Sequence, residues 1–531
     1  MASPPQNQLA DEALLRRMVS LDPEAAGPTT ALALLLVRKG ALEDAEPFAR
    51  AAVRLSPDDP TAHNLMGVIL TESRQPQAGE QHYRRVLALV ERPNATLLAS
   101  LAWNLKSQGR MEESRAFYQQ AFDLDPRLFT TLFGWAQMEA ADRQFDRAGE
   151  LLGAAEAVAP DRPEVALQRA ALLGRQNDYE AALGLLAEIE TRFGAELEPS
   201  LRLDLLNEKG RMLDRLGHYP AAFHAFGQAK QAMRAMTGQT YRADPAQAQA
   251  RRLALVFTAS RFAALPRAEV RDDVAQPIFI VGFPRSGTTM IEQTLSAHAR
   301  ISAGDELPII GEIVEAAQGL TGLSQPYPEG LAGLSGADGV RKLNVLRDAY
   351  LTRAAELGAT RAGADRFTDK MPLNETHLGL ISLIFPAAPV IHLIRHPLDV
   401  VLSTFANHMT HGFYCADDLV SIARHYLLTL QILAHYRRQT PLNYLAIRYE
   451  DVIDDQEAKV REMLAFVGVD YDPRCLAFHE NPRYARTASH AQVGEKLYDR
   501  SRYRWRGYRD QLAPVIPMLE PVIRLLGYEV D

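Results

Sequence analysis

The chain has 531 residues, long enough for more than one domain, and its 47% hydrophobic and 23% charged residues are typical of a soluble globular protein. A formal net charge of −8 argues against a general nucleic-acid binder, since such proteins present a basic surface to phosphates. The two cysteines, Cys415 and Cys475, exclude a disulfide framework and indicate a reducing compartment. Residues 1–19 lack a secretory pattern, and the apolar run 31–37 is too short to cross a bilayer, so we expect a soluble, cytoplasmic protein without a membrane span.

Residues 29–236 contain a repeat of helix–turn–helix units. A small residue opens each second helix, at spacings of 33, 36, 34, 34 and 40 residues; these residues are Ala45, Ala78, Ser114, Ala148, Ala182 and Ala222. A period near 34 residues resembles the tetratricopeptide repeat (TPR) family. One unit cannot bury its apolar face alone, so we predict an all-α solenoid of stacked units. Its concave surface could hold a protein or peptide, or the array could pack on the other domain or on a second copy.

The repeats divide the chain into four segments. Residues 1–28 form an N-terminal segment, 29–236 the TPR array, 237–275 a linker, and 276–531 a C-terminal domain. Asp244 suits a helix N-cap and Pro245 a first helical position, so a bridging helix is expected over residues 246–264 of the linker.

The strongest functional signal lies in residues 276–298. Residues 277–281 predict a short buried strand, and apolar residues after position 289 recur at helical spacing. Between them, a loop bounded by Gly282 and Gly287 brings backbone N–H groups and a helix N-terminus together, which is the structure of a phosphate site. Thr288 stands where ATP-binding loops carry a lysine, so a triphosphate is disfavoured, and Arg285 supplies the positive charge. The predicted anion contacts are Arg285, Ser286, Gly287, Thr288 and Thr289.

The PRSGTT sequence after an apolar strand resembles the 5′-phosphosulfate loop of sulfotransferases that use 3′-phosphoadenylyl sulfate (PAPS). The likeness is greatest to the protein-tyrosine sulfotransferase branch and runs from about residue 277 to the C-terminus. It implies an α/β, P-loop-like domain with a mostly parallel sheet and PAPS as co-substrate.

The resemblance also implies the catalytic residues. Glu306, in the Gly304-Asp305-Glu306 sequence, matches the family's general base, although a carboxylate at a helix start can also be a simple dipole cap. Lys370 matches the lysine that stabilises the leaving group, although it could be a plain surface lysine. Ser489 and Arg285 complete this set as stabilisers of the transferring group.

Further nucleotide contacts follow from the same resemblance. Arg395 after a second strand, with Ser403 eight positions later, matches the site of the 3′-phosphate, for which a guanidinium and a hydroxyl are suitable donors. One turn beyond Ser403 the family has a second arginine, but this chain has Asn407. The other implied contacts are Tyr449, Ser489, Gln492 and Arg504.

The basic, aromatic run 500–509 has two other readings, a nucleic-acid surface or a solvated helix face. We favour cofactor contact, because Trp505 lies 16 positions after Ser489, as in the family. His408 and His411 could share a helical face with Cys415 nearby, but no second ligand pair follows, so no metal is predicted.

The sequence therefore predicts a PAPS-dependent sulfotransferase that acts on an acceptor hydroxyl. The favoured acceptor is a tyrosine of a protein or peptide held by the TPR array. A carbohydrate or small-molecule acceptor, a P-loop kinase and a non-enzymatic TPR adaptor are the alternatives. No nucleic-acid partner is expected, and the oligomeric state, including a homodimer, is left open.

Overall fold

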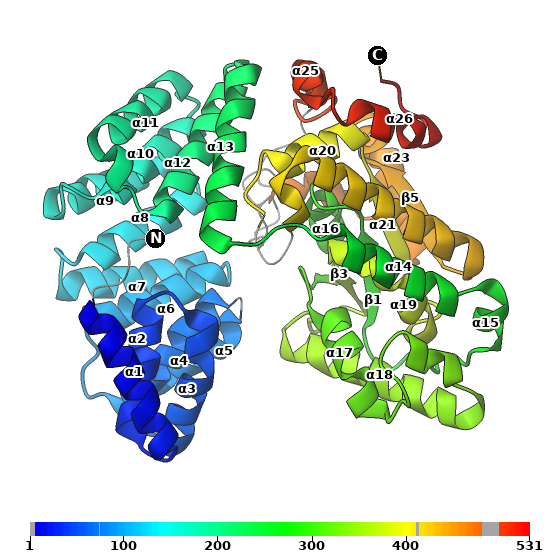
Figure 1. Ribbon diagram of the computed structural model, residues 1–531, viewed down its shortest axis with the longest axis horizontal. Coiled ribbons are helices and arrows are strands. Elements are labelled where there is room, and N and C mark those ends of the chain that lie inside the picture. Colours follow the sequence, from blue (N-terminus) through cyan, green and yellow to red (C-terminus); the bar gives the residue numbers. More distant parts are fainter. Residues whose placement is uncertain (1–5, 74, 410–413, 481–498, 531) are drawn as a thin grey trace. The chain divides into compact units, whose positions relative to one another are not determined.

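The structure is a computed structural model that describes residues 6–73, 75–409, 414–480 and 499–530. The chain divides into two compact units, residues 1–201 and 202–531 (Figure 1). Among the residues described, none of the helices combines the length and the apolar character needed to cross a membrane.

The described part of the first unit is helical, as the repeat predicted (Figure 1). After α1, consecutive helices pack as antiparallel pairs, α2 with α3 and so on to α10 with α11. The helices are α1 (Gln6–Leu21), α2 (Ala26–Arg38), α3 (Leu42–Leu55), α4 (Pro60–Glu72), α5 (Pro76–Leu89), α6 (Ala95–Ser107), α7 (Met111–Leu124), α8 (Phe129–Ala141), α9 (Phe145–Val158), α10 (Pro163–Arg175), α11 (Tyr179–Phe193), the 3₁₀ helix η1 (Gly194–Glu196), and α12 (Pro199–Arg215), which begins at the division between the units.

The small residues that mark the repeat are largely buried. Five of the six are completely buried: Ala45, Ser114, Ala148, Ala182 and Ala222. The long last spacing has a local cause, because η1 follows α11 and α12 is 17 residues long where α10 has 13.

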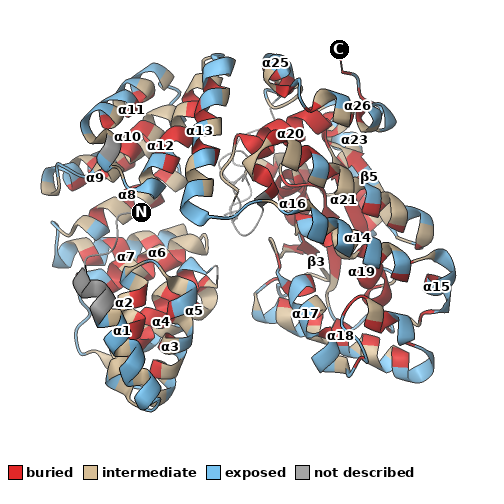
Figure 2. Cartoon of the chain, in the orientation of Figure 1, coloured by how far each residue is buried: buried red, intermediate tan, exposed pale blue. Residues whose placement is uncertain are grey.

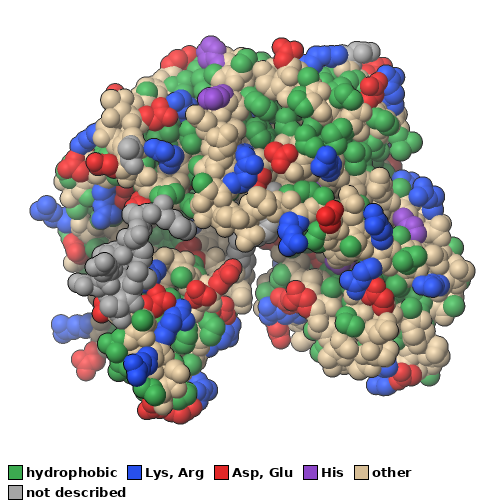
Figure 3. All heavy atoms as spheres, in the orientation of Figure 1, with side chains coloured by type: hydrophobic (Ala, Val, Ile, Leu, Met, Phe, Trp, Pro, Cys, Tyr) green, Lys and Arg blue, Asp and Glu red, His purple; other side chains and the backbone are tan. Residues whose placement is uncertain are grey.

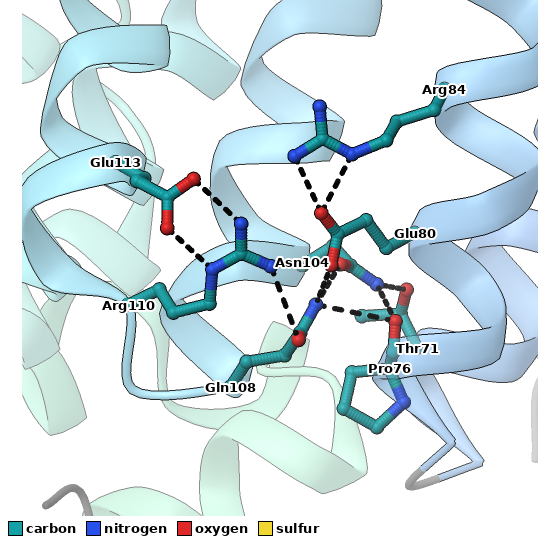
Figure 4. A network of polar contacts seen from close by, with 8 residues as sticks. All are labelled: Thr71, Pro76, Glu80, Arg84, Asn104, Gln108, Arg110 and Glu113. Carbon is teal, nitrogen blue, oxygen red and sulfur yellow. Dashed lines mark hydrogen bonds and ion pairs between the residues drawn. The ribbon is translucent and has the colours of Figure 1, made fainter. Parts of the chain in front are cut away.

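A buried polar network joins neighbouring pairs in the first unit (Figure 4). Asn104 of α6 is completely buried and donates to Thr71 Oγ1 of α4 at 2.7 Å and to the Pro76 carbonyl at 2.8 Å. Glu80 of α5 accepts hydrogen bonds from Gln108 and Arg110. Since a buried amide is stable only when its hydrogen bonds are made, this network fixes how α4 to α7 stack.

The second unit is built on a five-stranded sheet in the order β2-β3-β1-β4-β5, and every pairing is parallel. The predicted mostly parallel α/β fold is confirmed. The strands are β1 (Gln276–Val281), β2 (Ile301–Ala303), β3 (Arg366–Asp369), β4 (Val390–Ile394) and β5 (Tyr444–Arg448).

Alternate residues of β1 point to opposite faces of the sheet, and both faces are covered by helices (Figure 1). Phe279 and Val281 join a core with α14, α17, α18, α19 and α21. Ile278 and Ile280 join a core with α16 and α23. The helices of this unit are α13 (Tyr219–Thr237), α14 (Ala243–Val256), α15 (Ala259–Ala264), α16 (Thr288–Ser296), α17 (Ile309–Thr321), η2 (Glu329–Gly333), α18 (Gly336–Glu356), η3 (Pro372–His377), α19 (Leu378–Ile384), α20 (Pro397–Phe405), η4 (Tyr414–Asp417), α21 (Leu419–Gln439), α22 (Tyr449–Asp454), α23 (Gln456–Val467), η5 (Pro473–Glu480), η6 (Arg504–Tyr508), α25 (Arg509–Leu512) and α26 (Ile516–Leu525).

The last helical pair, α12 and α13, packs with the C-terminal domain inside the second unit. Ala222 and Phe226 of α13 share a core with residues of α20, α21, η6 and α26, and Phe223 stacks on Phe405 with 4.8 Å between ring centroids. Every residue of α20 is buried (Figure 2). The prediction of one continuous bridging helix over residues 246–264 is wrong, because the helix is interrupted at Phe257 and forms two helices, α14 and α15.

The surface carries charges of both signs. On the face shown in Figure 3, the acidic and basic side chains of the described residues are interspersed, and neither sign forms a continuous patch.

Candidate active site

The predicted phosphate loop lies between β1 and α16, at the carboxyl edge of the sheet. Gly287 caps α16 with a φ of 106°, and a Cβ there would lie 2.9 Å from the Tyr449 ring. Both facts require glycine. Ser286, Thr288 and Thr289 are buried beside it. The loop thus leads directly into the N-terminus of α16, which is where the predicted phosphate would bind.

The other predicted residues follow the carboxyl ends of the remaining strands. Glu306 comes after β2, Lys370 after β3, Arg395 after β4 and Tyr449 after β5. In a parallel sheet these ends share one edge, so the strand order sets the residues side by side around the loop after β1. The structure therefore assembles one site from five separate stretches of the chain.

Two predicted nucleotide contacts meet through a hydrogen bond. Arg285 Nε donates to Ser403 Oγ at 3.2 Å, so the loop touches α20. Arg395 Nη1 donates to the Arg285 carbonyl at 3.0 Å, and its guanidinium lies 5.0 Å from the centroid of the Tyr449 ring. These four side chains form one cationic corner.

The predicted base and the predicted leaving-group lysine are in direct contact. Lys370 Nζ donates to Glu306 Oε1 at 2.8 Å. The Lys370 side chain is 1% exposed, whereas that of Glu306 is 28% exposed. The carboxylate therefore remains open to an incoming group while the ammonium is fixed behind it. The apolar helix expected to open at Glu306 begins two residues after Leu307, at Ile309, so Glu306 lies in the turn before α17.

Glu292, which the sequence did not single out, holds that turn in place. Its Oε1 accepts from Thr368 Oγ1 at 2.7 Å and from the Asp305 N–H at 3.0 Å, and its residue is completely buried on α16. A Cβ on Gly304 would collide with the Thr368 carbonyl, so only glycine fits beside β3. The loop helix and the Glu306 turn are thus one connected structure. A lone carboxylate within an otherwise buried helix is the signal that could have revealed Glu292.

Two more buried carboxyls lie at the sheet edge. Burial raises the pKa of Asp369 to about 7, and Tyr350 donates to it at 2.7 Å. Burial also raises the pKa of Glu375 to about 8, and its Oε2 accepts the Gly282 N–H at 3.0 Å. Glu375 on η3 therefore fixes the first amide of the phosphate loop. The sequence did not predict a role for Asp369 or Glu375, because neither belongs to a recognised motif.

Glu450 plays a similar part for the Arg395 segment. Its Oε1 accepts the His396 N–H at 3.0 Å, and its Oε2 accepts from the Tyr528 hydroxyl at 2.5 Å. The carboxylate is buried, so it ties the end of β4 to the C-terminal segment.

The remaining predicted contacts lie further along the chain. Ser489 and Gln492 fall outside the described residues. Arg504 forms an ion pair with Asp214 of α12, with 2.9 Å between Nη2 and Oδ1, and lies over the Tyr508 ring. The Trp505 ring stacks on His396 with 5.1 Å between ring centroids, and the Trp505 backbone N–H donates to Asp399 Oδ1. The cofactor role of Arg504 stays a prediction.

A metal site was not expected. Within the described residues, no group of three or more His, Cys, Asp or Glu side chains is arranged to hold an ion. The sequence suggested a helical face for His408, but His408 does not lie on a helix, because α20 ends at Phe405.

This arrangement of strands, loop and charged side chains agrees with comparison to known proteins. Residues 277–473 match the sequence model of the sulfotransferase family, and residues 95–128 match a tetratricopeptide repeat. Residues 277–473 form a sulfotransferase-family domain. The phosphate loop, Glu306, Lys370, Arg395, Ser403 and Tyr449 all lie within this sulfotransferase-family domain.

Individual relatives cover parts of the chain. An uncharacterized protein of Aquifex aeolicus is 34% identical over 254 residues, which is 46% of this chain and 32% of that protein. Protein-tyrosine sulfotransferase A of Caenorhabditis elegans is 23% identical over 264 residues, 48% of this chain and 67% of that protein. The match thus spans about a third of the Aquifex protein. Among solved structures, Pseudomonas aeruginosa pilF is 22% identical with a TM-score of 0.31, over 39% of this chain and 92% of that one.

Proposed function

We propose that this protein is a PAPS-dependent sulfotransferase that transfers a sulfuryl group to an acceptor hydroxyl. The observation that carries the proposal is the Glu306–Lys370 pair at the carboxyl edge of the sheet, beside the phosphate loop. A base and a cation in contact suit a displacement in which a proton leaves one oxygen while negative charge develops on another.

In this proposal Glu306 takes the proton of the acceptor hydroxyl. Its carboxylate is partly exposed and can be reached by an acceptor. The hydroxyl oxygen forms the new bond to sulfur, and the bond between sulfur and the phosphate oxygen of the donor breaks. The proton ends on Glu306, from which water removes it.

Lys370 stabilises the charge that develops on the departing phosphate oxygen. A buried ammonium is effective there because the low local dielectric strengthens its electrostatic interactions. Arg285 and Ser489 are proposed to stabilise the oxygens of the transferring group. PAPS, when bound, supplies the activated sulfuryl group.

The donor set fits a doubly phosphorylated nucleotide. The loop residues Arg285 to Thr289 offer backbone N–H groups and a helix N-terminus to one phosphate. Arg395 and Ser403 offer a guanidinium and a hydroxyl to a second phosphate. The buried Ser286 Oγ, in the loop, has no hydrogen-bond partner among the described residues. Tyr449, Gln492 and Arg504 are proposed as further contacts. No lysine occupies the place where a triphosphate would be held.

We propose a tyrosine of a protein or peptide as the acceptor, held by the TPR array. The support is the repeat match, since such arrays bind peptides on their concave face, and the similarity to protein-tyrosine sulfotransferases. A carbohydrate or small-molecule hydroxyl is the competing acceptor.

Two experiments test the proposal. In calorimetry, adenosine 3′,5′-bisphosphate should bind the purified full-length protein and ATP should not. Tight binding of ATP alone would favour a kinase. If neither nucleotide binds, a non-enzymatic adaptor would be favoured. In the second, the protein and PAPS labelled in its sulfate are added to host extract, and the products are identified by mass spectrometry. Label on tyrosine would support both the sulfotransferase activity and the tyrosine acceptor. Label on glycans or metabolites would support the activity but show that the acceptor is a different hydroxyl.

A further inference from the structure

Glu375 of η3 lies directly against the phosphate loop. Its Oε2 accepts the N–H of Gly282, the glycine that opens the loop, at 3.0 Å. Glu375 also lines a small cavity together with Phe283 and Ser286 of the loop, the end of β4, and α21. The residue is 2% exposed. Its carboxyl is therefore shielded from bulk water and in contact with the loop that is proposed to hold a phosphate.

No cation neutralises this carboxyl among the residues that the structure describes. Its hydrogen bond comes from the Gly282 N–H, and no lysine or arginine of the described chain lies within ion-pair distance of it. Arg395 lines the same cavity, but its guanidinium donates to the carbonyls of Arg285 and Ser501. An ionised carboxylate buried against a single N–H is costly. Burial accordingly raises the pKa of Glu375 to about 8, so the neutral acid predominates at pH 7.

The other titratable groups around Glu375 keep one charge state near neutral pH. His392 of β4 lines the cavity, and burial lowers its pKa to about 3, so the imidazole is neutral. Burial, and then the charge of Glu375, raise the pKa of Tyr426 of α21, and burial raises that of Tyr444 of β5. The strand β1 and the helix α19, which also pack against η3, have no titratable side chain. Among the groups that line the cavity, Glu375 is thus the one expected to ionise between pH 7 and pH 9.

The neutral form of Glu375 has an O–H donor that the ionised form lacks. Ser286 Oγ lines the same cavity and has no hydrogen-bond partner among the described residues. It also lies close to the start of the loop, since a Cβ on Gly282 would be 2.8 Å from it. A neutral Glu375 can therefore accept from Gly282 and donate toward Ser286. An ionised Glu375 would instead put a negative charge beside a site for a phosphate, where like charges repel.

We propose that Glu375 is a positioning residue for the nucleotide: its neutral carboxyl holds the phosphate loop through Gly282 and Ser286, and binding of the 5′-phosphate requires the proton on Glu375. This inference rests on the proposed function. It adds a residue that acts through the loop and contacts neither the nucleotide nor the acceptor. Where Glu375 is ionised in the free protein, nucleotide binding is then coupled to the uptake of one proton from solvent.

The first test compares the pH dependence of binding in full-length variants by calorimetry. Between pH 7 and pH 9, wild-type affinity for adenosine 3′,5′-bisphosphate should fall by about 10-fold, because Glu375 must regain its proton. Glu375→Gln keeps an acceptor for Gly282 and a donor toward Ser286 but cannot titrate. It should bind within about 3-fold of wild type at pH 7 and lose less than about 2-fold at pH 9.

Two features of this comparison isolate Glu375. Asp369, with a pKa of about 7, is present in both proteins and contributes equally to the two curves. Glu315→Gln, at an exposed position of α17, is the matched control and should follow the wild-type pH dependence.

A second test needs only wild-type protein, in case Glu375→Gln does not fold. The same titration at pH 8.5, in two buffers of different ionisation enthalpy, gives the number of protons taken up with each nucleotide. Glu375 is mostly ionised in the free protein at this pH, so we expect uptake of about 0.5–1 proton.

The outcomes separate the two proposals. Parallel pH curves for wild type and Glu375→Gln, weak binding by a folded Glu375→Gln at pH 7, or no proton uptake at pH 8.5 would overturn the role of Glu375 while leaving the sulfotransferase proposal intact. Wild-type protein that does not bind the bisphosphate at pH 7 would instead overturn the proposed function.

Discussion

Lys370 and Glu306 lie 64 positions apart in the chain, yet Lys370 Nζ donates a 2.8 Å hydrogen bond to Glu306 Oε1. The contact exists because β2 and β3 are adjacent and parallel, so the residues that follow them emerge at the same edge of the sheet. The Lys370 N–H also donates to the Asp305 carbonyl at 2.9 Å, which locks the two turns together.

The pair should act as one unit in catalysis. We expect Glu306→Gln and Lys370→Met each to lower the rate of transfer to a small phenol by about 100-fold or more, and the double variant to be little slower than the worse single variant. The measurement is kcat with saturating PAPS.

Two controls accompany this cycle. Glu315→Gln, on an exposed position of α17, should retain full activity, and Glu306→Gln should bind adenosine 3′,5′-bisphosphate within about 3-fold of wild type. Rate losses that multiply in the double variant would show that the two residues act independently.

Glu375 should make the second unit less stable as pH rises. Its pKa is about 8 in the folded protein against an ordinary 4.5, so between these values the folded state holds a proton that the unfolded state has lost. The free energy of unfolding then falls with increasing pH, by about 1.4 kcal/mol per pH unit from this group. Because Glu375→Gln cannot titrate, its melting temperature should fall less between about pH 5.5 and pH 8 than that of wild type.

Glu315→Gln is again the matched control, and its melting temperature should follow the wild-type pH dependence. Parallel curves for Glu375→Gln and wild type would mean that Glu375 is ionised in the folded protein.

Gly287→Ala should disable the phosphate loop without unfolding the domain. The residue has a φ of 106°, and its new Cβ would lie 2.9 Å from the Tyr449 ring. Strain of about 1–3 kcal/mol should move the loop and weaken nucleotide binding by about 10-fold or more. Gly311→Ala, in open space on α17, should bind normally and melt no lower than wild type. Undiminished affinity in Gly287→Ala would show that the loop does not hold the nucleotide.

The Asp214–Arg504 pair should hold α12 against the C-terminal segment. Asp214→Ala removes the partner of Arg504 Nη2 at 2.9 Å and of the Tyr508 hydroxyl at 2.5 Å. We expect a loss of about 1–3 kcal/mol, measured by thermal unfolding, with nucleotide affinity nearly unchanged. Asp272→Ala, at an exposed position of the same unit, should not alter the melting temperature.

Arg504→Met should then weaken bisphosphate binding beyond any change in Asp214→Ala, if Arg504 also contacts the nucleotide. If both variants bind the bisphosphate with the same affinity, Arg504 has only a structural role, in its ion pair with Asp214.

The sequence predicted the parts of the site that depend on short-range patterns. The strand, glycine-bounded loop and helix around Arg285 form a local unit, as do the helix pairs marked by Ala45 and Ala148. Both patterns report which face of an element is buried or how a backbone must turn, and neighbouring residues decide those properties.

The tertiary structure alone decided which distant residues meet. The order of the strands placed Glu306 against Lys370, and the packing of α13 on α20 placed Lys230 beside Asn407. Glu292 and Glu375 carry no motif, because a buried carboxylate is distinguished by its partners and not by its neighbours in the chain. Local patterns cannot encode such contacts, since the partner is chosen only when the sheet and its covering helices assemble.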